Sequence, residues 1–511
     1  IAGADNFHDK RFAKLISHAM WSSEPVPFDP MEKSLHEVYE ETQPEDLRKG
    51  FHMVYEYPLA GKPPIMTHIY ENANNDRIIA SKGAPETILK VSKIEGGDVN
   101  KLQELLKDFG SKGFRILGVA EAVFGGNIFP ESQEDFDFEL VGFVMFYDPP
   151  KNGIEDVFRK FYEAGIKVKI ITGDNLETSR AIAMKAGIKN YNDIISGEQI
   201  TQLSEGELLK ASNEMTLFTR MFPEAKLSVV NALKKNNEVV AMVGDGVNDG
   251  PALKAAHIGV AMGHKGTEIA KAAASLVLVD DDLEKLIIAI AAGRRIYTNL
   301  KKAIQYIISI HIPIVLTVSI PLFLGWVFPQ IFTPMHIIFL ELVMGPTCSI
   351  VYENEPMERN AMTSKPRPIT QTFLKWGELF ISIIQGLIIT GGVLFAYQLT
   401  VRSGGNEETT RAIVFTTLIF ANILLSLVNR SFYYSILTTF RNANPLITIV
   451  TFFTLLFLSM MLYVEPIAVF FKLLPLDAGQ LFTCFGIAAV SVLWFELYKL
   501  FQRNKSKSQA N

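Results

Sequence analysis

This chain of 511 residues has only two cysteines and no net positive charge. The two cysteines, Cys348 and Cys484, each lie within an apolar run, so neither a disulfide framework nor a thiolate metal site is indicated. The formal net charge of −5 argues against a nucleic-acid partner. The sequence also has no internal repeat and no low-complexity tract. Its length exceeds what one hydrophobic core organises, so we expect about three domains.

Long apolar runs dominate the chain beyond residue 302 and predict a membrane domain. Six runs are long enough to span a lipid bilayer, at roughly 303–325, 334–351, 376–400, 411–429, 446–464 and 480–500. Basic residues such as Arg294, Lys301 and Arg430 gather at one set of their ends, whereas the opposite loops have little beyond Arg402 and Lys472. The positive-inside rule then places both termini and the soluble regions in the cytoplasm.

The middle of the chain alternates short apolar strands with helices, which predicts a doubly wound parallel sheet. We expect Val141–Phe146 to be its first strand. Polar residues follow two later strands, with Thr172 after Lys167–Ile171 and Asp245 after Val239–Val243. Because the carboxyl ends of parallel strands meet at one edge of a sheet, these side chains should lie close together.

Carboxylate and amide side chains cluster at the end of the second of these strands. Asp245, Asn248 and Asp249 offer hard oxygen ligands, which suit Mg²⁺ better than a soft metal. With the Thr172 hydroxyl and the Lys226 ammonium, they supply what phosphoryl transfer requires, namely groups that hold and neutralise phosphate oxygens. The alternative is an ordinary strand-to-helix turn rich in Asp, Asn and Gly.

The first part of the chain has an aromatic residue and several basic residues near predicted strands. Tyr57, Lys62, Lys82 and Arg115 could hold a purine nucleotide through stacking and phosphate pairing. Composition alone also fits ordinary surface lysines on loops, and this alternative stays open.

Polar side chains inside the predicted spans are few and therefore informative. Glu341 lies mid-span beside Gly345-Pro346, and His311 precedes Pro313, so both lie next to a proline that frees backbone carbonyls. Asn422 is a third candidate for a cation pathway. A paired structural carboxyl for Glu341 and a packing role for His311 are the alternatives.

Several motifs together resemble a known family. TGDN at 172–175, RMFPEAK at 220–226 and MVGDGVNDGPAL at 242–253 look like motifs of the P-type cation-transporting ATPases. DPP at 148–150, KGAPE at 82–86 and FDPMEK at 28–33 add to the resemblance. It covers essentially the whole chain, and the nearest branch is the calcium-pump-like group of bacteria, which implies a multi-pass protein of a bacterial cell membrane.

The resemblance implies an α/β haloacid-dehalogenase-like doubly wound domain at 141–302. A partial α+β nucleotide-binding domain at 1–140 would precede it, and an all-α transmembrane domain of six helices at 303–511 would follow. The implied phosphorylation site consists of Thr172, Gly173, Asp174, Arg220, Lys226, Asn248 and Asp249. The implied site for ATP consists of Glu32, Tyr57, Lys62, Lys82, Gly83 and Arg115. Asp245 would ligate Mg²⁺.

Two family motifs do not occur in these 511 residues, the DKTGT motif with its phosphorylated aspartate and the TGE motif of the actuator domain. The chain therefore resembles the C-terminal portion of a pump that begins inside the nucleotide-binding domain, and the missing N-terminal portion would be its partner. As an isolated polypeptide it should bind ATP weakly and form no phosphoenzyme. A non-catalytic membrane protein that binds ATP and Mg²⁺ is the alternative.

The transported cation is less defined than the family. Calcium pumps carry an Asn, a Thr and an Asp in the second span, whereas this chain has Glu341, Met344 and Gly345. The resemblance makes Glu341, Asn422 and His311 the candidate cation residues. Calcium is the first expectation by proximity of family, and another divalent cation or a proton stays open.

Overall fold

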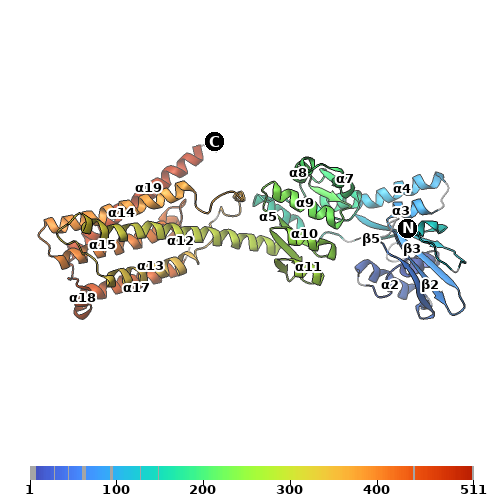
Figure 1. The fold of residues 1–511 in the computed structure, drawn as a ribbon, viewed down its shortest axis with the longest axis horizontal. Helices are drawn as coiled ribbons and strands as arrows, with labels where there is room; N and C mark the ends of the chain where they lie inside the picture. Colours follow the sequence, from blue (N-terminus) through green and yellow to red (C-terminus); the bar gives the residue numbers. More distant parts are fainter. Residues whose placement is uncertain are drawn as a thin grey trace. The chain divides into compact units, whose positions relative to one another are not determined.

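The computed structural model describes residues 7–508, except 28, 44, 60–64, 93–95, 127, 148, 359 and 441–443. The chain divides into two compact units, residues 1–283 and residues 284–511 (Figure 1). The first unit holds all the described strands, and the second is helical. Short 3-10 turns occur at Lys10–Phe12, Leu47–Gly50, Gln133–Asp135 and Val247–Asp249.

Five antiparallel strands open the first unit. They pair in sequence order as β1 (Phe51–Tyr57), β2 (Ile65–Asn72), β3 (Arg77–Gly83), β4 (Phe114–Ala122) and β5 (Phe138–Tyr147). The expectation that Val141–Phe146 opens the parallel sheet is wrong, because these residues lie in β5 and pair antiparallel with β4. An apolar run marks a strand, but its partner is a non-local property that the run does not encode.

Helices cover both faces of this sheet. They are α1 (Ala13–Trp21), α2 (Pro30–Thr42), α3 (Pro85–Val91) and α4 (Gly96–Ser111). On one face, Trp21 and Tyr39 from α1 and α2 pack with Tyr70 of β2. On the other face, Ile88 of α3 packs with Ile65. The side chains of neighbouring strand residues therefore serve two separate cores.

The remainder of the first unit alternates strands and helices as predicted. Its strands are β6 (Ile170–Ile171), β7 (Ile194–Ser196), β8 (Leu217–Thr219), β9 (Ala241–Gly244), β10 (Ile258–Met262) and β11 (Leu276–Leu278). Its helices are α5 (Ile154–Glu163), α6 (Leu176–Lys185), α7 (Gly197–Gln202), α8 (Glu205–Glu214), α9 (Pro223–Lys235), α10 (Gly250–Ala255) and α11 (Glu268–Ala273). All pairs among these strands are parallel.

The parallel strands form two sheets of three instead of one continuous sheet. Their orders are β6-β8-β7 and β11-β10-β9, so β6 and β9 each pair on one side only within the described residues. Helix α9 packs against both sheets, with Val229 in the core that contains Ile171 and Val230 in the core that contains Met242. Val240, just before β9, contacts both cores. The two sheets thus share one supporting helix.

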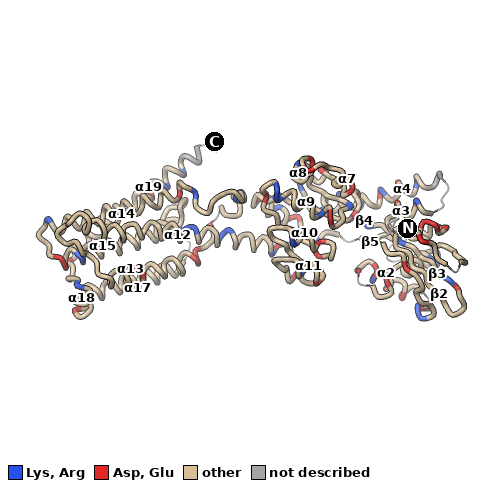
Figure 2. The backbone as a smooth tube through the Cα atoms, in the orientation of Figure 1, with Lys and Arg blue, Asp and Glu red and all other residues tan. Residues whose placement is uncertain are grey.

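The second unit is a bundle of long apolar helices (Figure 1). Its helices are α12 (Glu284–Phe323), α13 (Pro334–Pro346), α14 (Trp376–Arg402), α15 (Glu407–Val428), α16 (Ile436–Phe440), α17 (Pro445–Tyr463), α18 (Glu465–Phe471) and α19 (Ala478–Ser508). Within the described part of the chain, six helices are long and apolar enough to cross a membrane. Figure 2 shows long tubes with few charged residues through most of this bundle, which suits a lipid environment.

Two features of the bundle helices matter for the candidate cation residues. Helix α12 runs without interruption for 40 residues and so begins well before residue 303, where the apolar run starts. It contains Pro313, which lies beside a close approach to α14: a Cβ built on Gly386 would come within 2.9 Å of the Ser309 carbonyl oxygen. The helix α13 continues into a π-helical turn, η6 (Thr347–Tyr352), a feature that often marks functional sites.

Candidate functional site

The two predicted strand ends carry the residues that the motifs single out. Thr172 directly follows β6, and Asp245 directly follows β9. Gly244 allows the sharp exit from β9, because a Cβ there would lie 2.7 Å from the Asp249 Cβ. Only a residue without a side chain lets Asp249 fold back against the end of its own strand.

Lys226 and Asp249 form a buried ion pair at this edge. Lys226 Nζ lies 2.7 Å from Asp249 Oδ1, with side chains 12% and 10% exposed. The second carboxylate oxygen of Asp249 accepts a hydrogen bond from the Gly246 N–H at 3.2 Å. The pair comes from α9 and from the start of α10, so it ties the helix shared by both sheets to the loop after β9.

The Thr172 loop is held by backbone hydrogen bonds to the segment after β8. The Met221 N–H donates to the Thr172 carbonyl, and the Arg220 N–H donates to the Asp174 carbonyl, both at 2.9 Å. The Thr172 hydroxyl oxygen accepts from the Asp174 N–H at 3.1 Å, and Gly173 is exposed between them. Arg220 takes a left-handed φ of 49°, which turns the chain from β8 into this contact.

Asp245 fits a role as a magnesium ligand. Its side chain is exposed at the end of β9, while its backbone carbonyl accepts from the Thr267 N–H at 2.8 Å. Within the described residues its carboxylate has no ion-pair partner, unlike that of Asp249. Asn248 is exposed in the same loop. Accessible, uncompensated oxygens are the donors that Mg²⁺ takes from proteins.

The predicted nucleotide residues are only partly brought together. Lys82 Nζ lies 2.5 Å from Glu32 Oε1 and 2.8 Å from the Ser23 hydroxyl, and the Lys82 and Glu32 side chains are about one-tenth exposed. Burial lowers the pKa of Lys82, although Glu32 opposes that shift. Lys62 lies outside the described residues. Gly83 is buried where a Cβ would lie 2.6 Å from the Ile65 side chain, so close strand packing accounts for it.

Tyr57 lies on the other face of the sheet from Lys82. The strand register aligns Tyr57 with Thr67 and Ser81, and successive side chains point to opposite faces. The Tyr57 ring packs edge-on against Phe136, and its hydroxyl donates to the Pro130 carbonyl at 2.5 Å. The structure therefore does not place the predicted stacking ring beside the predicted phosphate-binding lysine.

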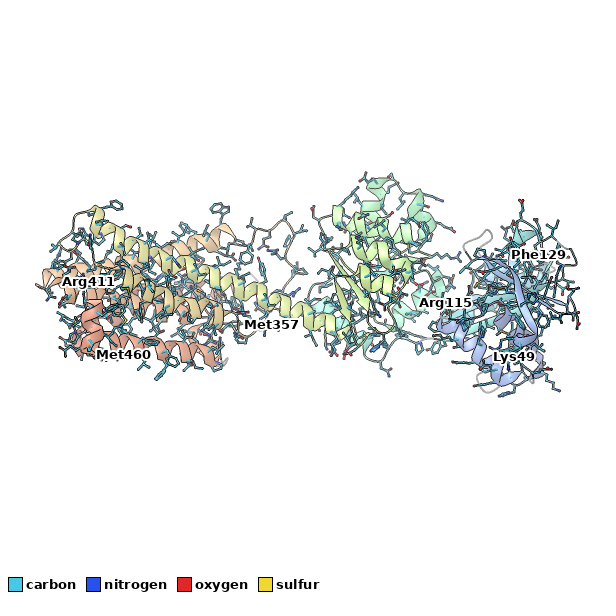
Figure 3. The ribbon with its side chains drawn as sticks, turned by 60° about the horizontal axis from the view of Figure 1, so that its bottom comes forward. Lys49, Arg115, Phe129, Met357, Arg411 and Met460 are labelled. Carbon is cyan, nitrogen blue, oxygen red and sulfur yellow. The ribbon has the colours of Figure 1, made fainter. Side chains whose placement is uncertain are left out.

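Arg115 instead connects the antiparallel region with the parallel region. Its side chain lies 3.5 Å from Asp174, at the labelled position in Figure 3. A second contact of the same kind joins Arg220 to Glu86 at 3.3 Å. Arg115 and Asp174 belong to different predicted sets, one for the nucleotide and one for the phosphoryl group. The structure thus joins the two sets through this pair.

The membrane candidates fall into two groups. His311 Nε2 lies 3.3 Å from Glu341 Oε1, and both side chains are about half exposed in the bundle. Asn422 is buried and accepts from the Tyr306 hydroxyl, while its side-chain nitrogen has no hydrogen-bond partner within the described residues. Among those residues, no hydrogen bond or ion pair joins Asn422 to the pair of His311 and Glu341.

A small cavity beside Asn422 shows polar residues that the sequence reasoning missed. Its volume is ≈ 10 Å³, about the room of one water molecule. Its polar lining consists of Thr347, Asn422, Ser426, Thr451 and Thr454. The signal was present in α17, where two threonines three residues apart interrupt an apolar helix on one face. Thr347 begins η6, so the irregular turn borders the cavity.

Two family models match the chain. One describes the C-terminus of cation-transporting ATPases and covers residues 329–501, and the other describes haloacid dehalogenase-like hydrolases and covers residues 63–257. The chain is 30% identical over 467 residues to calcium-transporting ATPase 1 of Lactococcus lactis, covering 89% of this chain and 52% of that protein. The chain belongs to the P-type cation-transporting ATPases. It resembles the calcium pumps within that family.

Other P-type ATPases match over the same extent. A calcium-transporting ATPase of Bacillus subtilis is 29% identical over 465 residues, covering 87% of this chain and 51% of that protein. The human calcium-transporting ATPase type 2C member 1 is 28% identical over 468 residues, covering 89% and 50%. The chain spans about half the length of these curated relatives.

The two family models divide the candidate residues of this P-type ATPase. The hydrolase match contains the strand-end loops from Thr172 to Asp249, and the cation-transporting match contains Glu341 and Asn422. His311 lies between the two matches, in α12. The haloacid dehalogenase-like fold and the membrane helices predicted from the sequence are thereby confirmed.

Proposed function

We propose that this chain is part of an ATP-driven pump that moves a cation across a membrane through an aspartyl-phosphate intermediate. Calcium is the proposed cargo, because the relatives it matches are calcium-transporting ATPases. The proposal places the first unit on the cytoplasmic side of a bacterial cell membrane, in line with the basic residues at one set of helix ends.

One observation supports the proposal: the candidate residues follow two strands that each pair on one side only within the described residues. Thr172 follows β6, and Asp245 follows β9, and each of these strands lies at one edge of its three-stranded parallel sheet. Both sheets rest on α9, whose Lys226 pairs with Asp249 in the loop after β9. A further parallel strand between them would complete one doubly wound sheet. A strand with the DKTGT motif would then present its aspartate between the two loops.

The chemistry of these loops suits a phosphoryl group on that aspartate. Lys226 would neutralise phosphate oxygens, and the exposed N–H of Gly173 and hydroxyl of Thr172 would donate to them. Asp245 would hold Mg²⁺, with Asn248 in support, and the ion supplies positive charge that stabilises the phosphoryl oxygens. Arg115 and Asp174 would bring the ATP site to this edge.

In the membrane, the proposal assigns the cation to polar groups of the bundle. Glu341 and His311 form one pair of donors, and Asn422 with the threonines of its cavity forms a second set of oxygens. Hard oxygens are the ligands that Ca²⁺ prefers. Glu341→Gln should lower calcium-stimulated ATPase activity of a complete pump much more than Glu353→Gln, a control on the nearby exposed loop.

The test of the proposed intermediate is acid-stable ³²P labelling by ATP. The purified chain Ile1–Asn511 should not label, because its sequence contains no DKTGT aspartate. Co-expression with a segment that carries DKTGT and TGE should restore labelling, and Lys226→Met should abolish it again. Labelling of the chain alone, or labelling that survives Lys226→Met, would overturn the assignment.

As a second candidate we propose a membrane protein that binds ATP and Mg²⁺ without turnover. Equilibrium binding of a fluorescent ATP analogue to the chain, weakened by Lys82→Ala, combined with no restoration by the added segment, would support this alternative.

A further inference from the structure

A group of possible metal ligands lies on the α1–α2 face of the antiparallel sheet, apart from the strand-end loops. One ligand atom each of Glu24, Glu56 and His68 lies within 4.8 Å of the others. The register pairs Glu56 of β1 directly with His68 of β2, so these side chains share one face. Glu24 reaches them from the loop after α1. Three separate segments thus converge on one point.

His68 is the decisive member of this group. Its side chain is 0% exposed, and neither ring nitrogen has a hydrogen-bond partner within the described residues. A buried imidazole without partners is costly, so it points to a ligand. Backbone groups of Trp21 and Ser23 lie beside the ring, and metal-bound histidines donate their second N–H to such groups.

Among the residues that the structure describes, neither Glu24 nor Glu56 forms an ion pair. Lys82, the nearby cation, is engaged with Glu32 and Ser23. A bound cation would offset the repulsion between Glu24 and Glu56 and would satisfy His68 at the same time.

We propose that Glu24, Glu56 and His68 form a site for a divalent transition-metal ion such as Zn²⁺, Mn²⁺ or Co²⁺. One imidazole and two carboxylates suit these ions better than Mg²⁺ or Ca²⁺, which prefer oxygens alone. Metal–ligand distances of about 2.0–2.2 Å require the ligand atoms to move somewhat closer, which the exposed side chain of Glu56 allows. The site leaves at least one coordination position for water. It is separate from Asp245 and does not depend on the proposed phosphoryl transfer.

The test is titration of the full chain, in detergent and without a histidine tag, with Co²⁺ in the presence of excess Mg²⁺. We expect one Co²⁺ per chain, with visible absorption bands of a nitrogen- and oxygen-ligated ion. His68→Gln and Glu56→Gln should each weaken binding at least tenfold. The matched controls are His52→Gln and Glu139→Gln, exposed residues on β1 and β5, which should bind as the unaltered chain does.

Either of two results would overturn the site: no saturable Co²⁺ binding, or equal binding by the site variants and their controls. Thermal unfolding of each variant shows whether it is folded. Should His68→Gln fail to fold, Glu56→Gln decides alone, because that exposed carboxylate is not part of the core. Asp245→Asn should keep the Co²⁺ site, and loss of binding there would reassign the ion to the strand-end loops.

Discussion

Removing the charge of Lys226 is the sharpest test of how the strand-end loops are held. Lys226→Met leaves the Asp249 carboxylate without its partner at 2.7 Å, in a position where that side chain is 10% exposed. Breaking a buried ion pair costs about 3–5 kcal/mol. Because a tenth of each side chain meets solvent and the Gly246 N–H still donates to Asp249, we expect about 3 kcal/mol.

Hydrogen exchange measured by mass spectrometry on the full chain gives this quantity locally. Peptides over Ala241–Ala255 report the free energy of opening β9 and α10. A loss of about 3 kcal/mol corresponds to roughly 100-fold faster exchange. The double variant Lys226→Met/Asp249→Asn, which removes both charges and keeps an acceptor for Gly246, should lose less than about 1 kcal/mol.

A matched surface pair provides the control. Lys235 and Glu205 lie 2.5 Å apart on α9 and α8, with side chains 61% and 70% exposed. Lys235→Met should leave exchange nearly unchanged, because water and salt screen an exposed pair. The reasoning fails if the single and double variants at Lys226 exchange alike, since the unpaired charge would then not be the cause.

Three further predictions concern packing, pH and transport. Gly244→Ala should destabilise the protein by about 1–3 kcal/mol in urea unfolding, because the new Cβ would lie 2.7 Å from the Asp249 Cβ. Gly246→Ala should cost less, because the nearest atom to its Cβ, Asp249 Oδ2, lies 3.6 Å away. Burial lowers the pKa of Lys169 in the folded chain to about 8, from 10.5. Between about pH 8 and 10.5 the unfolded chain therefore binds more protons than the folded chain, and the free energy of unfolding should rise with pH. Lys169→Met should flatten this rise when the free energy is measured by urea unfolding. In a complete pump, His311→Ala should shift the calcium dependence of ATPase activity in the same direction as Glu341→Gln, because the two side chains lie 3.3 Å apart.

The strand ends could be predicted from the sequence because their signals are local. An apolar run followed by Thr172, or by Gly244-Asp245, marks both the strand and its polar end. The structure pairs Lys226 with Asp249 in the loop after β9, two residues that the motifs placed in one site. Local pattern was sufficient here because each residue occupies a fixed place relative to its own strand.

The pairing partners of the strands and their register could not be predicted from local patterns. The sequence does not state that β5 pairs with β4, nor that the parallel strands divide into two sheets. Tyr57 and Lys82 fall on opposite faces because of the register of β1, β2 and β3, and a shift by one residue would reverse this. The same register brings His68 to Glu56, which no spacing along the chain indicates.

The length and anchoring of α12 have a mechanical consequence. Its 40 residues extend about 60 Å, roughly twice the thickness of the hydrocarbon core, so about half of the helix lies outside the apolar layer. Pro313 leaves the Ser309 carbonyl without its helical donor at the point where Gly386 of α14 comes closest. The missing hydrogen bond makes the helix easier to bend at a place where it packs closely against α14. Bending at this point would change the orientation of His311, which lies between Ser309 and Pro313, more than its position.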